Sequence, residues 1–391
     1  MEQPQGFIST GKETRVCHLK KAIYGLKQAS RAWNSNIHAA LTELGFKQTI
    51  ADAGVYVMHQ QEGDGPLYVI LYIDDITILG ASLEAVKELK ANLAQRYEIS
   101  NLGKIKSYLR IRITRDQQNK RLTIDQSGYV KDVLVRFGMA DANPHHTPLL
   151  AGADSHLVKY DSQASAMDIK NYQSLIGSLL YVQIGTCPDI SFAVSHLAQY
   201  AANPSPEHQR LAQYVLTYLV GTQDACLCYD GANGEGLYGY TDSSLADQTD
   251  DRHSTSGYVF LLANGAISWS SRKQKTVAQN TTHAEYMAMT DATNQGVWYR
   301  SFLMELGYTV DEPILLHSDN KGAMDLAENP VTVRRSKHID IRHHAVHKYI
   351  EEGKISMIRT PTAEMVADGF TKSLLHALLQ RFNSDMGLDG A

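Results

Sequence analysis

Cysteine and long apolar runs are both scarce in this 391-residue sequence, and each scarcity excludes a class of protein. The four cysteines stand at no zinc-finger spacing and indicate no disulfide framework, as in proteins of a reducing compartment. The most apolar stretch, LYVILYIDDITILG, carries two acids in its centre, and no run reaches membrane-spanning length. The first residues are polar, so no signal peptide is predicted. We therefore expect an intracellular protein without a membrane partner.

A strong excess of charge of one sign is lacking too, since 37 Lys and Arg stand against 42 Asp and Glu, a formal net charge of −5. Enzymes of nucleic acids are often basic, so this balance argues mildly against one, but it leaves room for local basic grooves. Hydrophobic residues make up 43% of the chain. Because a single core rarely grows beyond about 250 residues, we expect two or three globular domains.

Hydrophobic periodicity predicts two regions before residue 231, at 1–100 and 101–230. In the first, two β-rich runs flank Asp74 and Asp75, which indicates a hairpin. In the second, a stretch near 141–167 that is rich in Pro, Ala, Ser and Asp is the predicted linker. The helices expected here cover 29–44, 82–97, 172–183, 189–202 and 206–220, and the strands cover 67–73, 76–79, 107–114 and 121–124.

The third region, 231–391, has three predicted strands followed by alternating helices and strands. Asn264-Gly265, between the second and third strands, is a strong hairpin signal. This order predicts an α/β layer fold, with a mixed sheet and flanking helices. The strands are expected over 236–241, 256–262, 266–270, 313–318 and 354–359, and the helices over 282–306, after 320, over 341–352 and over 364–382.

Four acids lie at predicted element ends in this region. Asp242 ends a strand, Glu285 lies early in a helix, Asp319 ends another strand and Asp368 opens the last helix. Strand ends and helix starts can converge on one sheet edge, where four carboxylates would repel one another unless hard divalent cations joined them. Two Mg²⁺ ions about 3.5–4 Å apart suit phosphodiester hydrolysis. The alternative is that each acid is a turn or cap residue.

The order of these acids and their surrounding sequence resemble the ribonuclease H domain of copia-type retrotransposon polyproteins. The resemblance is carried by GYTDSSLAD, RHSTSGYVFLL, GAISWSSRKQKTVAQ, THAEYMAM, HSDNKGAMDL, KHIDIRHHAVH and MVADGFTKSL. It implies that Asp242, Glu285, Asp319 and Asp368 are catalytic and hold Mg²⁺, with Mn²⁺ as the alternative. The implied substrate is the RNA strand of an RNA–DNA hybrid, which its 2′-hydroxyls distinguish from DNA. The family usually has an acid where this chain has His283.

Basic and histidine side chains near these motifs leave further alternatives open. The histidines His338, His343, His344 and His347 suggest zinc, but no Cys or acid completes a tetrahedral set, so a solvated, weakly basic helix is favoured. Six basic residues are candidate phosphate contacts, with an ordinary solvated surface as the alternative. These are Arg272, Lys273, Lys275, Arg334, Arg335 and Lys337.

The first region resembles the copia-type polymerase core, through CHLKKAIYGLKQASRAW, LGF, DAGVYV and YIDD. By that resemblance Asp74 and Asp75 are the catalytic, metal-holding acids of a reverse transcriptase hairpin, and Gln28 lies near template or nucleotide. Asp in a hairpin turn is also common for conformational reasons alone. In the family another polymerase Asp lies upstream of a segment like MEQPQGF, at which this chain begins. We therefore expect no DNA synthesis by this chain alone.

SYLRIRI, LTIDQSGYV, LIGSLLYV, TCPDISFAV and YLVGTQD resemble the thumb and connection of the same polyprotein, with Arg110 where Gly is usual. The implied domains are thus a truncated α+β palm at 1–100, a thumb- and connection-like region at 101–230 and a ribonuclease H-like domain at 231–391.

The resemblance implies a Mg²⁺-dependent endoribonuclease joined to a polymerase remnant. Its implied partners are RNA–DNA hybrid, template RNA and nascent DNA, in cytoplasmic retrotransposon particles whose DNA product enters the nucleus. The alternative is a decayed or repurposed remnant that binds nucleic acid without catalysis. Metal-dependent cleavage, as opposed to binding alone, separates the two. The sequence leaves the oligomeric state open.

Overall fold

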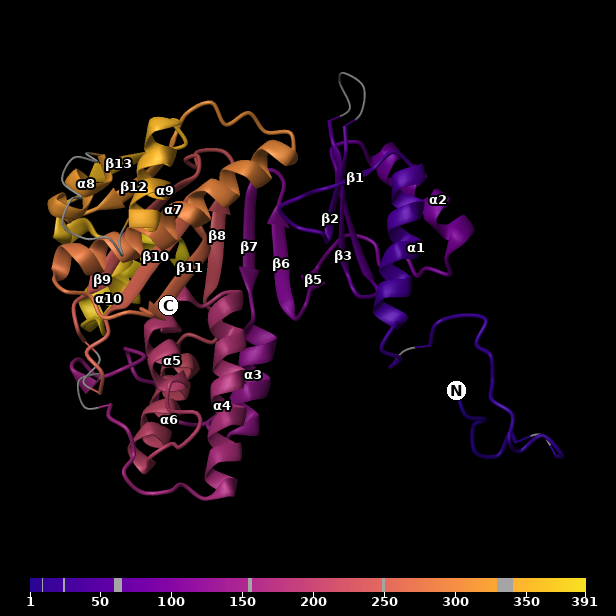
Figure 1. The fold of residues 1–391 in the computed structure, drawn as a ribbon, viewed down its shortest axis with the longest axis horizontal. Coiled ribbons are helices and arrows are strands. Elements are labelled where there is room, and N and C mark those ends of the chain that lie inside the picture. Colours follow the sequence, from indigo (N-terminus) through magenta and orange to yellow (C-terminus); the bar gives the residue numbers. More distant parts are fainter. Residues whose placement is uncertain (9, 24, 60–64, 154–156, 248–249, 329–339) are drawn as a thin grey trace. The chain divides into compact units, whose positions relative to one another are not determined.

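The computed structural model describes the chain except residues 9, 24, 60–64, 154–156, 248–249 and 329–339 (Figure 1). The described chain forms two compact units. The first comprises Met1–Asn101 with Ser301–Thr309, and the second comprises Leu102–Arg300 with Val310–Ala391. Within the described residues, no helix has the length and apolar character needed to cross a bilayer.

The first unit is built on an antiparallel sheet of four strands in the order β1–β2–β3–β4. Ile37 and Leu41 of α1 and Leu89 and Leu93 of α2 are buried in one core with the sheet residues. Ser82 accepts a hydrogen bond from the backbone nitrogen of Ala85 and so caps α2, as expected from the sequence. The elements are α1 (Ala29–Glu43), β1 (Lys47–Gln48), β2 (Val55–Met58), β3 (Leu67–Tyr72), β4 (Asp75–Gly80) and α2 (Leu83–Arg96). The predicted helices and hairpin of this region are thus confirmed.

The second unit contains two five-stranded sheets, in the orders β14–β8–β7–β6–β5 and β11–β10–β9–β12–β13. Its first elements are β5 (Ser107–Tyr108), β6 (Ile111–Asp116), β7 (Arg121–Asp125), α3 (Ser127–Arg136), α4 (Ala166–Gly185), η2 (Pro188–Ile190), α5 (Ser191–Ala198), α6 (Pro206–Gly221) and β8 (Cys226–Asp230). The remaining elements are β9 (Tyr238–Ser244), β10 (Thr255–Leu262), β11 (Gly265–Lys273), α7 (Thr281–Glu305), β12 (Ile314–Ser318), α8 (Lys321–Glu328), α9 (Asp340–Glu351), β13 (Ile355–Arg359), η4 (Thr362–Glu364), η5 (Val366–Phe370), α10 (His376–Asp385) and β14 (Leu388–Asp389).

The sheet with β9 at its centre is mixed, as predicted. β9, β10 and β11 are antiparallel, whereas β12 runs parallel to both β9 and β13. Phe260 of β10 and Leu316 of β12 share a core with Tyr286 of α7, on one face of the sheet. Val259 and Leu261, on the opposite face of β10, join a core that includes residues of η5 and α10. The sheet is therefore covered on both faces, and β9 lies between its two halves.

The β10–β11 hairpin forms where the sequence predicts it, but one residue earlier in register. Leu262 pairs with Gly265, so the two loop residues are Ala263 and Asn264 rather than Asn264 and Gly265. Both take positive φ, at 53° and 64°. This is the backbone conformation that a two-residue hairpin loop requires, and Asn adopts it more readily than most residues.

The stretch near 141–167 contributes two leucines to the core, whereas most of its other described residues are exposed, and its interpretation as a linker stays a prediction. Leu149 and Leu157 are each 1% exposed and belong to the main hydrophobic cluster of the second unit. α4 already starts at Ala166, because Ser165 accepts a hydrogen bond from the backbone nitrogen of Asp168. The same cluster contains residues from both 101–230 and 231–391. These two regions share one core, and their separate functional labels stay predictions.

Two further elements differ from the expectation. The strand expected over 107–114 is a hairpin, β5–β6, whose turn residues Leu109 and Arg110 have φ of 49° and 60°. A position with positive φ suits glycine, the residue expected there from the family resemblance.

The helix expected over 364–382 is also wrong, since η4, η5 and α10 replace it. The rings of Phe370 and Phe382 pack edge to face, with their centroids 5.1 Å apart. A continuous helix would separate their backbones by about 18 Å, so burial of the two rings together requires the chain to turn.

Candidate active site

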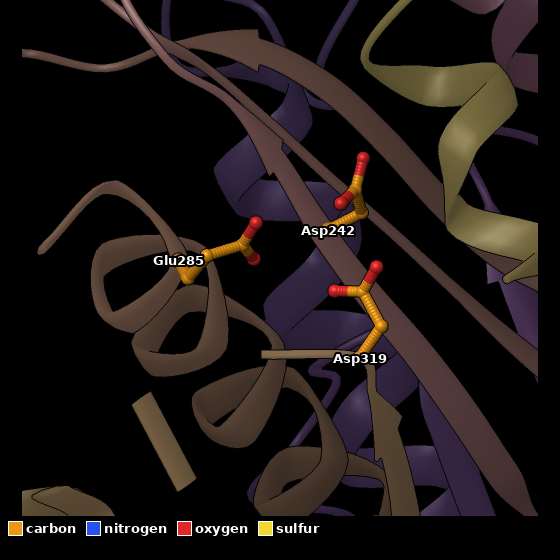
Figure 2. A group of neighbouring side chains, drawn as sticks. All are labelled: Asp242, Glu285 and Asp319. Atoms are coloured by element: carbon orange, nitrogen blue, oxygen red, sulfur yellow. The ribbon is translucent and has the colours of Figure 1, made fainter. Parts of the chain in front are cut away.

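Three of the four acids singled out from the sequence converge. Asp242 lies in β9, Glu285 in the second turn of α7, and Asp319 directly after β12. Figure 2 shows the three carboxylates pointing toward one another. One oxygen from each lies within 4.8 Å of the others. Within the described part of the chain, this is the one group of three or more acidic, His or Cys ligand atoms at such spacing.

Two of these carboxylates are buried. Asp242 is 6% exposed and Glu285 is 4% exposed. Burial raises the pKa of both side chains, and the charges of the neighbouring acids raise it further. Oε2 of Glu285 is buried without a hydrogen-bond partner among the described residues. An all-oxygen set of donors with one unsatisfied buried atom fits a hard divalent cation such as Mg²⁺.

Asp368, the fourth acid, is held apart from the other three. The sequence analysis predicts that Asp368 opens an α-helix, but the residue lies in the 3₁₀ helix η5. Its Oδ2 forms an ion pair with Nζ of Lys372 at 2.8 Å. Its charge contributes to the raised pKa of Asp242, so it lies next to the group without belonging to it.

Two threonine hydroxyls that the sequence analysis missed position the carboxylates. Oγ1 of Thr371 donates to Oδ2 of Asp242, and Oγ1 of Thr362 donates to Oδ2 of Asp319 at 2.6 Å. Thr371 follows Asp368 by three residues, in the segment MVADGFTKSL that carries the family resemblance. The motif therefore contained the signal, although only its acid was interpreted.

A glycine in β10 lets Thr371 approach. Gly257 pairs with Asp242 across β9 and β10. A Cβ at Gly257 would lie 2.7 Å from Cβ of Phe370 and 2.8 Å from Cγ2 of Thr371. Any side chain at this position would push η5 and the following residues off the sheet, and would move the hydroxyl of Thr371 away from Asp242.

Asp74 and Asp75 lie in the first unit, at the tip of the β3–β4 hairpin, and both are exposed. Trp33 of α1 supports the turn, since its Nε1 donates to the carbonyl of Ile73 at 2.7 Å. Across the described residues, no third acidic, His or Cys ligand forms a close group with the two aspartates. Gln28, the other candidate, is exposed at the N-terminus of α1.

The structure describes only some of the basic and histidine candidates. Arg272 and Lys275 are exposed, whereas Nζ of Lys273 forms an ion pair with Oδ2 of Asp251 at 2.7 Å. His347 directs one ring nitrogen to the carbonyl of Ala327 and the other to Glu351, which leaves no free nitrogen for zinc. Arg334, Arg335, Lys337 and His338 lie outside the described residues, as do the side chains of His343 and His344.

Comparison with known proteins identifies the family. Residues 1–151 match the family described as reverse transcriptase (RNA-dependent DNA polymerase). The putative transposon Ty5-1 protein of Saccharomyces cerevisiae is 32% identical over 292 residues, which cover 74% of this chain and 93% of the yeast protein. The chain belongs to the copia-type retrotransposon Pol family. The resemblance to copia-type retrotransposon polyproteins, which the sequence motifs indicate, is thus confirmed.

Other relatives show how much of a polyprotein is represented. The Retrovirus-related Pol polyprotein from transposon TNT 1-94 of Nicotiana tabacum is 36% identical over 377 residues, which cover 95% of this Pol chain and 28% of the tobacco protein. This Pol chain therefore spans about a quarter of the length of such curated relatives. The solved structure of LC11-RNase H1 is 16% identical to this Pol chain, and the match covers 35% of this Pol chain and 92% of the LC11-RNase H1 chain, with a TM-score of 0.28.

Proposed function

We propose that the second unit of this Pol chain is a metal-dependent nuclease that cuts the RNA strand of RNA–DNA hybrids. The observation that carries the proposal is the convergence of Asp242, Glu285 and Asp319 from three separate elements, in a chain of the copia-type Pol family. When bound, Mg²⁺ or Mn²⁺ supplies Lewis-acid chemistry that suits phosphodiester hydrolysis.

The hydrogen bonds of the site indicate which atoms would hold the cation. Oδ2 of Asp242 and Oδ2 of Asp319 each accept a threonine hydroxyl, so both carboxylates are fixed in orientation and keep Oδ1 for a ligand bond. Oε2 of Glu285 is buried and unpartnered, and a cation would satisfy it. Asp368 could bind the cation through Oδ1, because Oδ2 is paired with Lys372. It could bind through Oδ2 only after Lys372 moves away.

The substrate class follows from the family and from the exposed cations. Arg272 and Lys275, at the end of edge strand β11 and just after it, are exposed and available for phosphate groups. The 2′-hydroxyls of the RNA strand would distinguish it from DNA. Lys273 is the weaker candidate of the three, since its ammonium is already paired with Asp251.

For the first unit we propose a reverse transcriptase palm hairpin that carries two of the acids of a polymerase site, Asp74 and Asp75. The family match over residues 1–151 supports this assignment. Because no third ligand groups with these two acids in the described chain, we expect no template-directed DNA synthesis from this chain alone. A primer-extension assay with template RNA tests this, and extension by the purified chain would contradict it.

The nuclease proposal is tested on the whole purified chain with a labelled RNA–DNA hybrid, in Mg²⁺, Mn²⁺ or EDTA. Single-stranded RNA and duplex DNA are the substrate controls. We expect cleavage of the RNA strand of the hybrid alone, and only with metal. Asp319→Asn should lose cleavage at least hundredfold and still fold. Asp325→Asn, which neutralises an exposed acid of neighbouring α8, is the matched control and should cleave as the wild type does.

The competing function is non-catalytic binding of nucleic acid by a decayed Pol remnant. It predicts that the folded chain retains hybrid in a binding assay but leaves the RNA intact with either metal. That result would overturn the nuclease proposal, and so would equal cleavage by wild type and Asp319→Asn.

A further inference from the structure

The positively charged side chain of Lys372 lies at the candidate metal site, next to Asp368. Nζ of Lys372 lies 2.8 Å from Oδ2 of Asp368, and the Lys372 side chain is half-exposed. The preceding residue, Thr371, is bonded to Asp242, so the backbone here is fixed against the site. The ammonium of Lys372 is therefore paired with Asp368, one residue after the threonine that is bonded to Asp242.

The position of this ammonium has a consequence for metal binding. One divalent cation can be held by Asp242, Glu285 and Asp319, through carboxylate oxygens that do not pair with a lysine or arginine of the described chain. A second cation between Asp242 and Asp368 would approach the ammonium of Lys372 closely and compete with it for Oδ2 of Asp368. Two positive charges at such separation repel each other strongly where solvent screening is low.

We propose that Lys372 is an internal counter-cation that takes the place of a second metal ion at Asp368, so that the site binds one divalent cation readily and a second only after Lys372 leaves Asp368. This inference rests on the proposed metal site and names its stoichiometry and control. Lys372 acts here as a positioning residue, since it fixes Asp368 and sets the charge of the site.

The local geometry distinguishes Lys372 from an ordinary surface lysine. Lys131, for example, forms an ion pair of similar length with Asp224, at 3.1 Å, and both partners are more than half exposed. Removal of Lys131 affects a single solvated carboxylate, whereas removal of Lys372 leaves Asp368 unpaired beside a buried acid. A divalent cation is then the strongest available replacement.

The test is a Mn²⁺ titration of the whole chain without substrate. The concentration of free Mn²⁺ at each step is measured by electron paramagnetic resonance. Lys372→Met removes the ammonium and keeps most of the apolar stem. Lys372→Arg keeps the charge, and Lys131→Met is the matched control. We expect wild type to bind a second Mn²⁺ at least tenfold more weakly than the first. Lys372→Met should tighten the second site about tenfold, and the other two variants should match wild type.

Each other outcome overturns part of the argument. If Lys372→Met folds by circular dichroism but leaves the second affinity unchanged or weaker, the inference fails even if the wild type cleaves hybrid. If the wild type binds no Mn²⁺ but Lys372→Met does, the lysine is confirmed as a counter-cation and the proposed function fails for the natural chain. If neither binds Mn²⁺, both proposals fail.

Discussion

Thr371 donates a hydrogen bond from Oγ1 to Oδ2 of Asp242, which lies 129 residues earlier in the chain, and both side chains are buried. The bond connects the segment after η5 to the central strand β9 at the candidate metal site. It stabilises the ionised form of a carboxylate that burial otherwise drives toward protonation. A residue that contacts no metal in this arrangement can therefore determine how well the site binds one.

The first prediction is that Thr371→Val weakens metal binding without unfolding the protein. Valine matches threonine in shape but cannot donate, so Asp242 would lose its orientation and its pKa would rise further. We expect Mn²⁺ affinity to fall by roughly 10–100-fold, the usual effect of removing a hydrogen bond to a ligand. Thr290→Val is the control, because that hydroxyl is buried in α7 and bonds only locally, to the carbonyl of Tyr286. Equal affinities in the two variants would contradict the role of Thr371.

The second prediction concerns Glu285→Gln in EDTA. Burial and the charges of the neighbouring acids raise the pKa of Glu285 when no metal is present, so at pH 8 the folded protein holds a proton that the unfolded chain releases, and this costs stability. The neutral amide needs no proton at this pH and can donate to the neighbouring carboxylates. We expect the melting temperature at pH 8 to rise by a few degrees, which corresponds to about 1–2 kcal/mol. Adding Mg²⁺ should stabilise the wild type more than the variant.

The control for this change is Glu328→Gln, which neutralises an exposed acid at the end of α8 and should leave the melting temperature within about a degree of wild type. A Glu285→Gln variant that melts below wild type in EDTA would show that the buried carboxyl of Glu285 does not cost stability in the metal-free protein.

The third prediction uses a buried acid outside the metal site. Asp189 is 4% exposed, accepts a hydrogen bond from the hydroxyl of Tyr218 at 2.6 Å, and has a buried Oδ1 without a partner. Burial raises the pKa of Asp189 to about 6. The folded protein therefore holds this proton at pH values where the unfolded chain releases it, and the wild type loses stability as pH rises from about 4 to about 6.

Asp189→Asn should remove this dependence, because the amide stays neutral at every pH in that range. Relative to wild type, the variant should gain roughly 2–3 kcal/mol in free energy of unfolding between pH 4 and pH 7, since one pKa unit corresponds to about 1.4 kcal/mol. Denaturant unfolding at both pH values measures the difference. Parallel pH profiles for the two proteins would show that burial does not raise the pKa of Asp189 above its ordinary value.

The fourth prediction tests whether the stretch near 141–167 is part of the core. Leu149 is 1% exposed and Leu150 is 46% exposed, so two adjacent leucines give a matched pair. Leu149→Ala should destabilise the second unit by about 2–5 kcal/mol through loss of buried surface and a cavity. Leu150→Ala should change the stability by less than about 0.5 kcal/mol. Equal small effects would support the interpretation of this stretch as a linker.

Much of the local structure could be predicted from the sequence, because it depends on neighbours in the chain. Ser82 before an apolar helical pattern predicts α2, and the cap is present. Asn264 next to Gly265 predicts a hairpin, although the loop uses Ala263 and Asn264. The predictions failed where distant contacts decide. Phe370 and Phe382 fit the apolar spacing of one helix, but their mutual packing requires a turn between them.

For the candidate site, the sequence by itself determined which acids are present and that Asp242 belongs to a strand, Glu285 lies early in a helix and Asp319 follows a strand, because motif and strand pattern are local properties. Only the tertiary structure decided that these three acids meet while Asp368 pairs with Lys372, and that Thr362 and Thr371 orient two of the carboxylates. The physical reason is that burial and hydrogen bonding depend on groups far apart in the chain. Their effect on a carboxylate exists only once the sheet has brought them together.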